Sequence, residues 1–159
     1  MPSYCFLTAR RRAWTAPLAP SVILYAGRGV RWLAIEYRGT ESGAVPAPRG
    51  PYSPAVVWNE LVFVSGLLAM REDGTVVSGG IREEAVVVLR NLSKILEDAG
   101  SGLDRVLSVT VYLRDIGELP AFNEVYEEMF KPPFPARSAV QASPPAGFRV
   151  ELAAVACLK

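Results

Sequence analysis

The sequence predicts an α+β domain, a two-layer sandwich in which a mixed β-sheet carries two helices on one face. Two long stretches repeat apolar residues at spacings of three and four, the period of an amphipathic helix. Five shorter stretches are continuously apolar or alternate between apolar and polar residues, as strands do. Their order along the chain is strand, strand, helix, strand, helix, strand, strand. Two helices against one sheet leave the second face of that sheet uncovered.

The first two strands are predicted to form a hairpin. Apolar runs over 55–58 and 61–68 lie two residues apart, a spacing typical of β-hairpins. A loop rich in proline and glycine over 44–53 leads into them. The second run contains Ser65 and Gly66. Glycine inside a strand marks a bulge, or a place where a ligand approaches the backbone closely.

Two helices and a strand follow. The stretch 81–99 has one apolar stripe and ends at Gly100, as helices commonly do. A strand with two distinct faces is predicted over 106–113. A second amphipathic helix is predicted over 115–130, and the prolines at 132–133 end it.

The last two predicted strands, 140–142 and 148–156, flank a turn-forming cluster at 143–147. This spacing favours a hairpin or a close crossover. Arg137 and Glu151 stand near the two ends of this stretch. An unpaired buried charge costs several kcal/mol, so each is expected to have a partner or a function. The residues alone leave open a mutual ion pair or a solvated sheet face.

Composition excludes several classes of function. The chain has 159 residues and 17.2 kDa, which suits one domain with a sizeable core. A net charge of +1 gives no electrostatic reason to expect a nucleic-acid or membrane partner. No histidine is present, and Cys5 and Cys157 lie at opposite ends, so neither a zinc site nor a histidine-based triad is expected. We expect a cytoplasmic protein that uses no metal and no cofactor.

Residues 1–45 differ from the rest of the chain. The first 35 residues contain no acidic residue, carry five arginines and show no clear period. Three interpretations compete: an organelle transit peptide, an upstream region included through a wrong start site, or an additional strand and arm. The segments 22–25 and 32–37 are apolar enough to pair as strands. We predict a dispensable extension over 1–45 and one domain over 46–159.

The stretch Pro135-Ala136-Arg137-Ser138, followed after a strand and a turn by Val150-Glu151-Leu152, resembles the signature of the YjgF-like Rid family, the reactive intermediate deaminases. Further matches occur in the family's order over about residues 46–158. They are Gly50-Pro51-Tyr52-Ser53-Pro54-Ala55, Val64-Ser65-Gly66, Leu96-Glu97-Asp98-Ala99-Gly100 and Phe122-Asn123-Glu124-Val125-Tyr126.

This resemblance implies a fold like that of bacillus-type chorismate mutase, in homotrimers with active sites between subunits. Such a trimer would cover the apolar sheet face that the two helices leave open. The implied activity is hydrolysis of 2-imino and 2-enamino acids, such as 2-aminoacrylate, 2-iminopropanoate and 2-iminobutanoate, to 2-oxo acids and ammonia.

The resemblance also implies roles for individual residues. Arg137 would bind the substrate carboxylate through its planar fork of donors. Glu151 would hold and deprotonate the attacking water, and Tyr52 would orient the substrate. Catalytic roles thus fall to Glu151 and Tyr52, and the implied substrate-binding residues are Arg137, Tyr52, Ser65, Gly66, Ala139 and Asn123.

Two departures from the family pattern bear on activity. Ala139 stands where family members often have cysteine, so any role of a thiol is lost. Leu67 replaces a common glutamine, which alters the expected substrate preference. The alternative function is a non-catalytic trimer that binds small carboxylate metabolites. A translation-inhibiting ribonuclease ranks lower, because the neutral charge and the missing histidine give RNA little to bind and no usual base.

Overall fold

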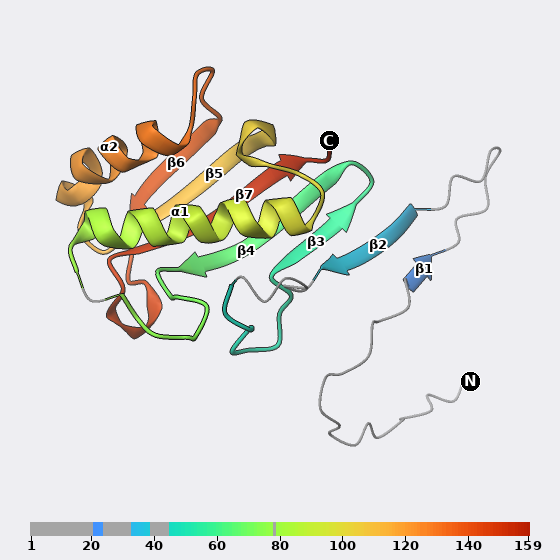
Figure 1. Ribbon diagram of the computed structural model, residues 1–159, viewed down its shortest axis with the longest axis horizontal. Coiled ribbons are helices and arrows are strands. Elements are labelled where there is room, and N and C mark those ends of the chain that lie inside the picture. The colour runs from blue at the N-terminus through green and yellow to red at the C-terminus, as the bar shows by residue number, and fades with distance from the viewer. Residues whose placement is uncertain (1–20, 24–32, 39–44, 78) are drawn as a thin grey trace, which may run out of the picture.

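The computed structural model describes residues 21–23, 33–38, 45–77 and 79–159, the first two ranges as strand backbone only. It confirms the predicted two-layer α+β fold, in which α1 (Ile81–Asp98) and α2 (Leu119–Met129) cover one face of a mixed sheet (Figure 1). In the described residues the strands are β1 (Ser21–Ile23), β2 (Leu33–Arg38), β3 (Ala55–Trp58), β4 (Leu61–Leu68), β5 (Val106–Leu113), β6 (Ala136–Gln141) and β7 (Val150–Cys157). None of the helices in these residues is long and apolar enough to span a bilayer.

The strand order is β1-β2-β3-β4-β7-β5-β6, and β5 and β6 are the parallel pair in it. Of the two predicted connections between the last two strands, the hairpin is wrong and the close crossover is confirmed, because β5 lies between β6 and β7. The turn over 143–147, which contains a 3-10 helix (Pro145–Gly147), instead carries the chain across one strand. The physical reason is burial: β7 sits between β4 and β5, where its apolar residues Val150 and Leu152 are fully covered by the helices.

The hairpin of β3 and β4 is confirmed, with Asn59 in its turn at a φ of 56°. The predicted irregularity at the glycine of β4 is also present. The register between β4 and β7 shifts between Val64 and Leu67, the mark of a β-bulge. The bulge lies at Ser65 and Gly66, two of the predicted site residues.

One helix and one strand begin at other residues than the sequence predicts. The helix predicted over 115–130 divides into a 3-10 turn (Ile116–Glu118) and α2, because the Asp115 carboxylate accepts a hydrogen bond from the Gly117 amide at 2.8 Å and stabilises the tighter turn. Strand β6 begins at Ala136 rather than at residue 140, since its parallel pairing with β5 starts there, opposite Ser108. Arg137 therefore lies inside a strand.

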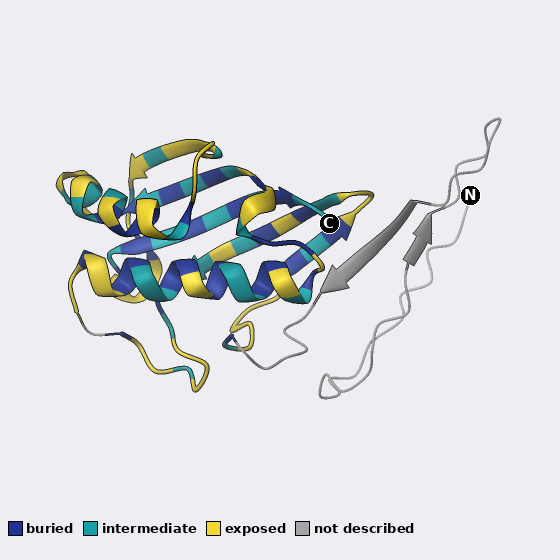
Figure 2. Cartoon of the chain, turned by 45° about the horizontal axis from the view of Figure 1, so that its top comes forward, coloured by how far each residue is buried: buried dark blue, intermediate teal, exposed yellow. Residues whose placement is uncertain are grey.

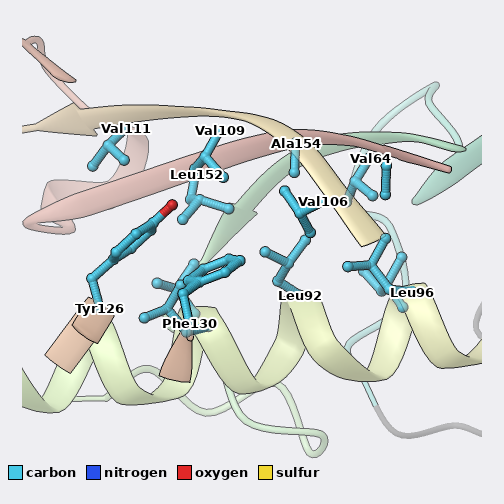
Figure 3. Close-up of a cluster of buried hydrophobic side chains, with 14 of the residues drawn as sticks. Val64, Leu92, Leu96, Val106, Val109, Val111, Tyr126, Phe130, Leu152 and Ala154 are labelled. Carbon is cyan, nitrogen blue, oxygen red and sulfur yellow. The ribbon is translucent and has the colours of Figure 1, made fainter. Parts of the chain in front are cut away.

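The core fills the space between the helices and the sheet. Figure 3 shows Leu92 and Leu96 of α1, and Tyr126 and Phe130 at α2, meeting side chains that the sheet directs toward them. A buried leucine contributes about 1.5–3 kcal/mol relative to an exposed one. Two polar contacts fix α1 to loops of the sheet. Asn91 donates to the Met70 carbonyl at 2.8 Å, and the Glu84 carboxylate accepts from the Arg149 amide at 2.8 Å.

The sheet face opposite the helices carries exposed apolar side chains, as predicted. Trp58, Phe63 and Val140 alternate with helix-facing neighbours and are 40%, 41% and 45% exposed in the single chain. Figure 2 shows buried residues alternating with more exposed ones along the central strands of the sheet. Exposed apolar side chains on several strands of one sheet face are typical of an interaction site.

Three interpretations of residues 1–45 were open, and the structure supports the one that adds strands to the sheet. The backbone of β1 pairs with β2, and β2 pairs with β3 over four positions. Val45 is only 5% exposed and belongs to the main core. The domain boundary predicted at residue 45 stays a prediction, and these contacts suggest that it lies before Leu33.

We expect a chain that begins at Leu33 to unfold at the same urea concentration as the full chain. A chain that begins at Pro46 loses β2 and Val45, and burial of a valine side chain alone is worth about 1.5–3 kcal/mol. Its free energy of unfolding should fall by at least that amount. Val45→Ala in the chain that begins at Leu33 removes the valine side chain but keeps β2, so it measures the contribution of that side chain alone. Equal urea midpoints for all chains would place the boundary at residue 45 after all.

Candidate active site

The predicted site residues fall into two groups. We call the first the Glu151 cluster, which consists of Tyr52, Ser65, Gly66 and Glu151. Glu151 lies against Gly66, and Gly66 lines a cavity with Ser65, Tyr52 and residues of α1. We call the second the Arg137 cluster, which consists of Asn123, Tyr126, Phe134 and Arg137. One predicted residue, Ala139, lies on β6 beside the Arg137 cluster.

Strand register places the two charged side chains on opposite faces. Glu151 alternates with Val150 and Leu152, which face the helices, so its carboxylate faces the uncovered side. Arg137 is in register with Val109, which is buried under the helices, so its side chain lies on the helix side. The ion pairs within residues 45–77 and 79–159 include none between Arg137 and Glu151. A mutual ion pair within one chain is therefore excluded as the explanation of these residues.

Gly66 brings the Glu151 carboxylate against the backbone of β4. A methyl group built on Gly66 would overlap Glu151 Oε1, so a residue with a side chain would push the carboxylate away. The bulge between Val64 and Leu67 opens the ladder at the same place. The glycine and the bulge together provide room for a carboxylate beside exposed strand backbone.

Ser65 connects this strand to the loop that carries Tyr52. Its hydroxyl donates to the Ser53 carbonyl at 2.7 Å, and its amide donates to the Pro54 carbonyl at 3.0 Å. Because the hydroxyl proton is used in this way, Ser65 can offer a ligand only its acceptor lone pairs. Tyr52 is exposed and lines, with Ser65 and Gly66, a cavity of about 60 Å³.

The Arg137 cluster surrounds a larger cavity of about 290 Å³ between β6 and α2. The guanidinium carbon of Arg137 lies 4.6 Å from the centroid of the Tyr126 ring, within the range of a cation–π interaction. The side-chain oxygen of Asn123 is buried and has no hydrogen-bond partner among the described residues. Phe134 is half-exposed and forms part of the cavity wall. Glu127 borders the same cavity, which thus combines one cation, one carboxylate, an aromatic platform and one free acceptor.

Sequence reasoning assigned Tyr126 only to the apolar stripe of the second helix. The structure places it beneath Arg137, and burial raises the pKa of its hydroxyl to about 12. One signal was available: Asn123 and Tyr126 are three residues apart, so they lie on the same face of a helix. A polar pair within an apolar stripe points to a cavity rather than to continuous core.

The two departures from the family pattern occupy apolar surroundings. Ala139 is in register with Val111 and packs against the main core, on the same face as Arg137. Leu67 also packs against that core. Neither position offers a hydrogen-bonding side chain to a ligand.

The described residues contain no group of three or more histidine, cysteine, aspartate or glutamate side chains arranged to hold a metal ion. The chemistry that the two clusters offer is carboxylate binding by Arg137 and proton transfer by Glu151. Within one chain the sheet separates these two functions.

Comparison with known proteins places these residues in context. The model of a protein family described as Endoribonuclease L-PSP matches residues 42–158. A human protein named 2-iminobutanoate/2-iminopropanoate deaminase is 41% identical over 121 residues, which cover 75% of this chain and 88% of the human one.

Solved structures agree with this match. RidA from an Antarctic Psychrobacter species superimposes with a TM-score of 0.72 at 32% identity, over 76% of this chain and all of the other. The Escherichia coli protein TdcF, solved with bound serine, gives 0.70 at 26% identity, over 77% of this chain and 99% of the other. With the family match over most of the chain and the motifs in family order, this protein belongs to the YjgF-like Rid family.

Proposed function

We propose that this protein hydrolyses 2-imino and 2-enamino acids to 2-oxo acids and ammonia. The observation that carries the proposal is Arg137, which borders a cavity of about 290 Å³ and forms no ion pair within the described part of the chain. A guanidinium with free donors at a cavity suits a ligand carboxylate. The name of the human relative, 2-iminobutanoate/2-iminopropanoate deaminase, supports this substrate class.

The proposed reaction begins with the substrate carboxylate held by the Arg137 fork. An enamine first takes a proton on its terminal carbon and gives up a proton from nitrogen, which leaves the imine. A water molecule then adds to the imine carbon, Glu151 accepts a proton from that water, and the C=N bond becomes a single bond. Glu151 returns this proton to nitrogen, which gives the neutral carbinolamine. The hydroxyl proton of the carbinolamine then passes to nitrogen, again through Glu151, as the C=O bond forms, the C–N bond breaks and ammonia leaves. One water is consumed for each 2-oxo acid and ammonia formed.

This reaction makes modest demands on the protein. An imine carbon is already electrophilic, so no covalent nucleophile is needed, and positioning with one proton carrier is enough. Tyr52, which borders the same cavity as Gly66, is suited to orient the substrate from the Glu151 cluster. Ser65, Gly66, Asn123 and Ala139 complete the proposed substrate-binding set.

We further propose that the active site forms between subunits of a homotrimer. The sheet separates Arg137 from Glu151 within a chain, so a second copy is required to bring the two clusters to one substrate. The exposed Trp58, Phe63 and Val140 supply the apolar surface for such an assembly. A net charge of +1 favours a small molecule over nucleic acid or membrane as the partner, and the free thiol of Cys157 favours the cytoplasm.

The assembly has a direct test. We expect sedimentation equilibrium at micromolar concentration to give the mass of three chains. Phe63→Glu places a charge in the proposed interface and should yield inactive, folded monomers. Leu107→Glu, at an exposed position in the register shift at the start of β5, serves as a comparison for surface charge. An active wild-type monomer would remove both the trimer and the site between subunits.

Arg137→Lys keeps the charge but loses the two-donor fork. A hydrogen bond to a charged group contributes about 1.5–3 kcal/mol, so we expect kcat/KM to fall about 10- to 100-fold. The melting temperature should not change, since Arg137 forms no ion pair with described residues. The assay follows 2-oxo acid formation from freshly generated 2-aminoacrylate, with chelator present. Unchanged kcat/KM would remove Arg137 from the site.

Glu151→Gln tests the proton-transfer role. General base catalysis contributes about 10²–10⁴-fold, so kcat should fall by a factor in that range, while pyruvate, the product of 2-iminopropanoate hydrolysis, still binds. A structural ion pair predicts the opposite pattern, a loss of about 3–5 kcal/mol of stability with little effect on turnover. Melting curves beside the activity assay separate the two.

The binding-module alternative has its own outcome in the same assay. If the wild-type protein does not accelerate imine hydrolysis over buffer but binds pyruvate through Arg137, the deaminase proposal fails. The protein would then be a receptor for small carboxylate metabolites.

A further inference from the structure

We propose that Tyr126 is a positioning residue for Arg137, whose ring holds the guanidinium in the orientation that presents its donors to the substrate carboxylate. The inference rests on the proposed function, because it takes the carboxylate of a 2-imino acid as the ligand. It assigns Tyr126 no contact with the reacting atoms.

The contact between the two side chains is close. The guanidinium carbon lies 4.6 Å from the Tyr126 ring centroid, well inside the distance of about 6 Å at which a ring attracts a cation. Arg137 is exposed and lies on β6, the edge strand of the sheet. An exposed arginine loses considerable rotamer entropy when it binds a ligand in one geometry. A ring that already fixes the guanidinium reduces that cost.

The ring itself is held firmly. Tyr126 is 3% exposed, and Phe130 stacks on it with centroids 4.4 Å apart and planes 27° apart. Phe122 packs at a tilt with its centroid 5.8 Å from that of Tyr126. Figure 3 shows Tyr126 and Phe130 side by side, reaching from α2 toward the sheet. Because its neighbours pack on both sides, the ring acts as a rigid platform beneath Arg137.

The hydroxyl of Tyr126 does not explain why the residue is placed there. It is buried and has no hydrogen-bond partner among the described residues. Burial raises its pKa to about 12, although the nearby Arg137 charge lowers it in part. A raised pKa keeps the phenol neutral at every pH below that value, so it does not exchange protons during the reaction near neutrality. The contribution of Tyr126 therefore comes from its ring, and phenylalanine should replace it.

The helix α2 directs a second group toward the same cavity. Asn123 lies one turn before Tyr126 on α2, and its buried side-chain oxygen also lacks a partner among the described residues. Both residues line the cavity with Arg137. The guanidinium can donate to a carboxylate, and the free oxygen of Asn123 can accept from an N–H of the same ligand. A core-packing role for Tyr126 does not explain why its ring lies below the guanidinium in this cavity.

The test measures pyruvate affinity by NMR titration, which tolerates weak binding, beside melting curves. Tyr126→Leu and Tyr126→Met remove the ring with different losses of volume, and Tyr126→Phe keeps it. We expect the first two to weaken pyruvate binding about 5- to 30-fold, the factor that corresponds to a cation–π interaction, and to raise KM more than they lower kcat. Tyr126→Phe should bind pyruvate as the wild-type protein does.

Two controls separate positioning from stability. Leu96→Ala removes a buried core side chain of α1 that lies away from Tyr126 in Figure 3, so it should lower the melting temperature and leave pyruvate affinity unchanged. In an Arg137→Met background, Tyr126→Leu should cause no further loss of affinity, because residues that act through one another are not additive.

Wild-type affinity in the Tyr126→Leu and Tyr126→Met variants would overturn the inference. An equal loss in the Arg137→Met background, or a failure of Tyr126→Phe to restore binding, would overturn it as well. Failure of the proposed function looks different. If the wild-type protein does not accelerate imine hydrolysis but its variants show this pattern of pyruvate binding, the proposed deaminase activity is wrong. The positioning role of Tyr126 would still hold.

Discussion

The parallel pairing of β5 with β6 determines on which face of the sheet Arg137, the proposed substrate-binding residue, lies. Since Arg137 is in register with Val109, a residue buried under the helices, its side chain is directed toward α2. A shift of one residue in β6 would turn the guanidinium to the uncovered face of the sheet. The crossover through α2 that connects parallel strands also supplies Asn123 and Tyr126, so one topological feature places both the cation and its surroundings.

The same topology keeps Arg137 and Glu151 from neutralising each other. With β5 between their strands and the sheet between their faces, neither satisfies the other within a chain, and both stay available to a ligand. A 2-imino acid carries a carboxylate next to the carbon that water attacks, so it needs a cation and a base only a few bonds apart. The proposed homotrimer would reconcile these two requirements, and it would bury the apolar sheet face at the same time.

Much of this arrangement follows from local sequence patterns, but the strand order does not. Strands β3 and β5 begin and end where alternation and turn residues predict, and α1 ends one residue before its predicted end. Strand β4 begins where predicted but continues to Leu68, beyond the end expected at Ser65 and Gly66. The placement of β5 between β6 and β7 could not be predicted, because pairing of distant strands leaves no mark on the period of either. The contact between Tyr126 and Arg137 was missed for the same reason, since it depends on the register of β6 against β5.

Because position 139 is alanine and position 67 is leucine, substrate recognition and proton transfer fall to other residues of the two clusters. Both side chains pack against apolar core, so neither offers a substrate a side-chain hydrogen bond or a thiol. In the proposed reaction, recognition then depends on Arg137 and its aromatic platform, and proton transfer depends on Glu151. This small set suffices because the imine carbon is electrophilic without activation, and because positioning and general base catalysis act together. A chain without histidine is therefore chemically sufficient for imine hydrolysis, provided that its subunits bring the Arg137 cluster and the Glu151 cluster to the same substrate.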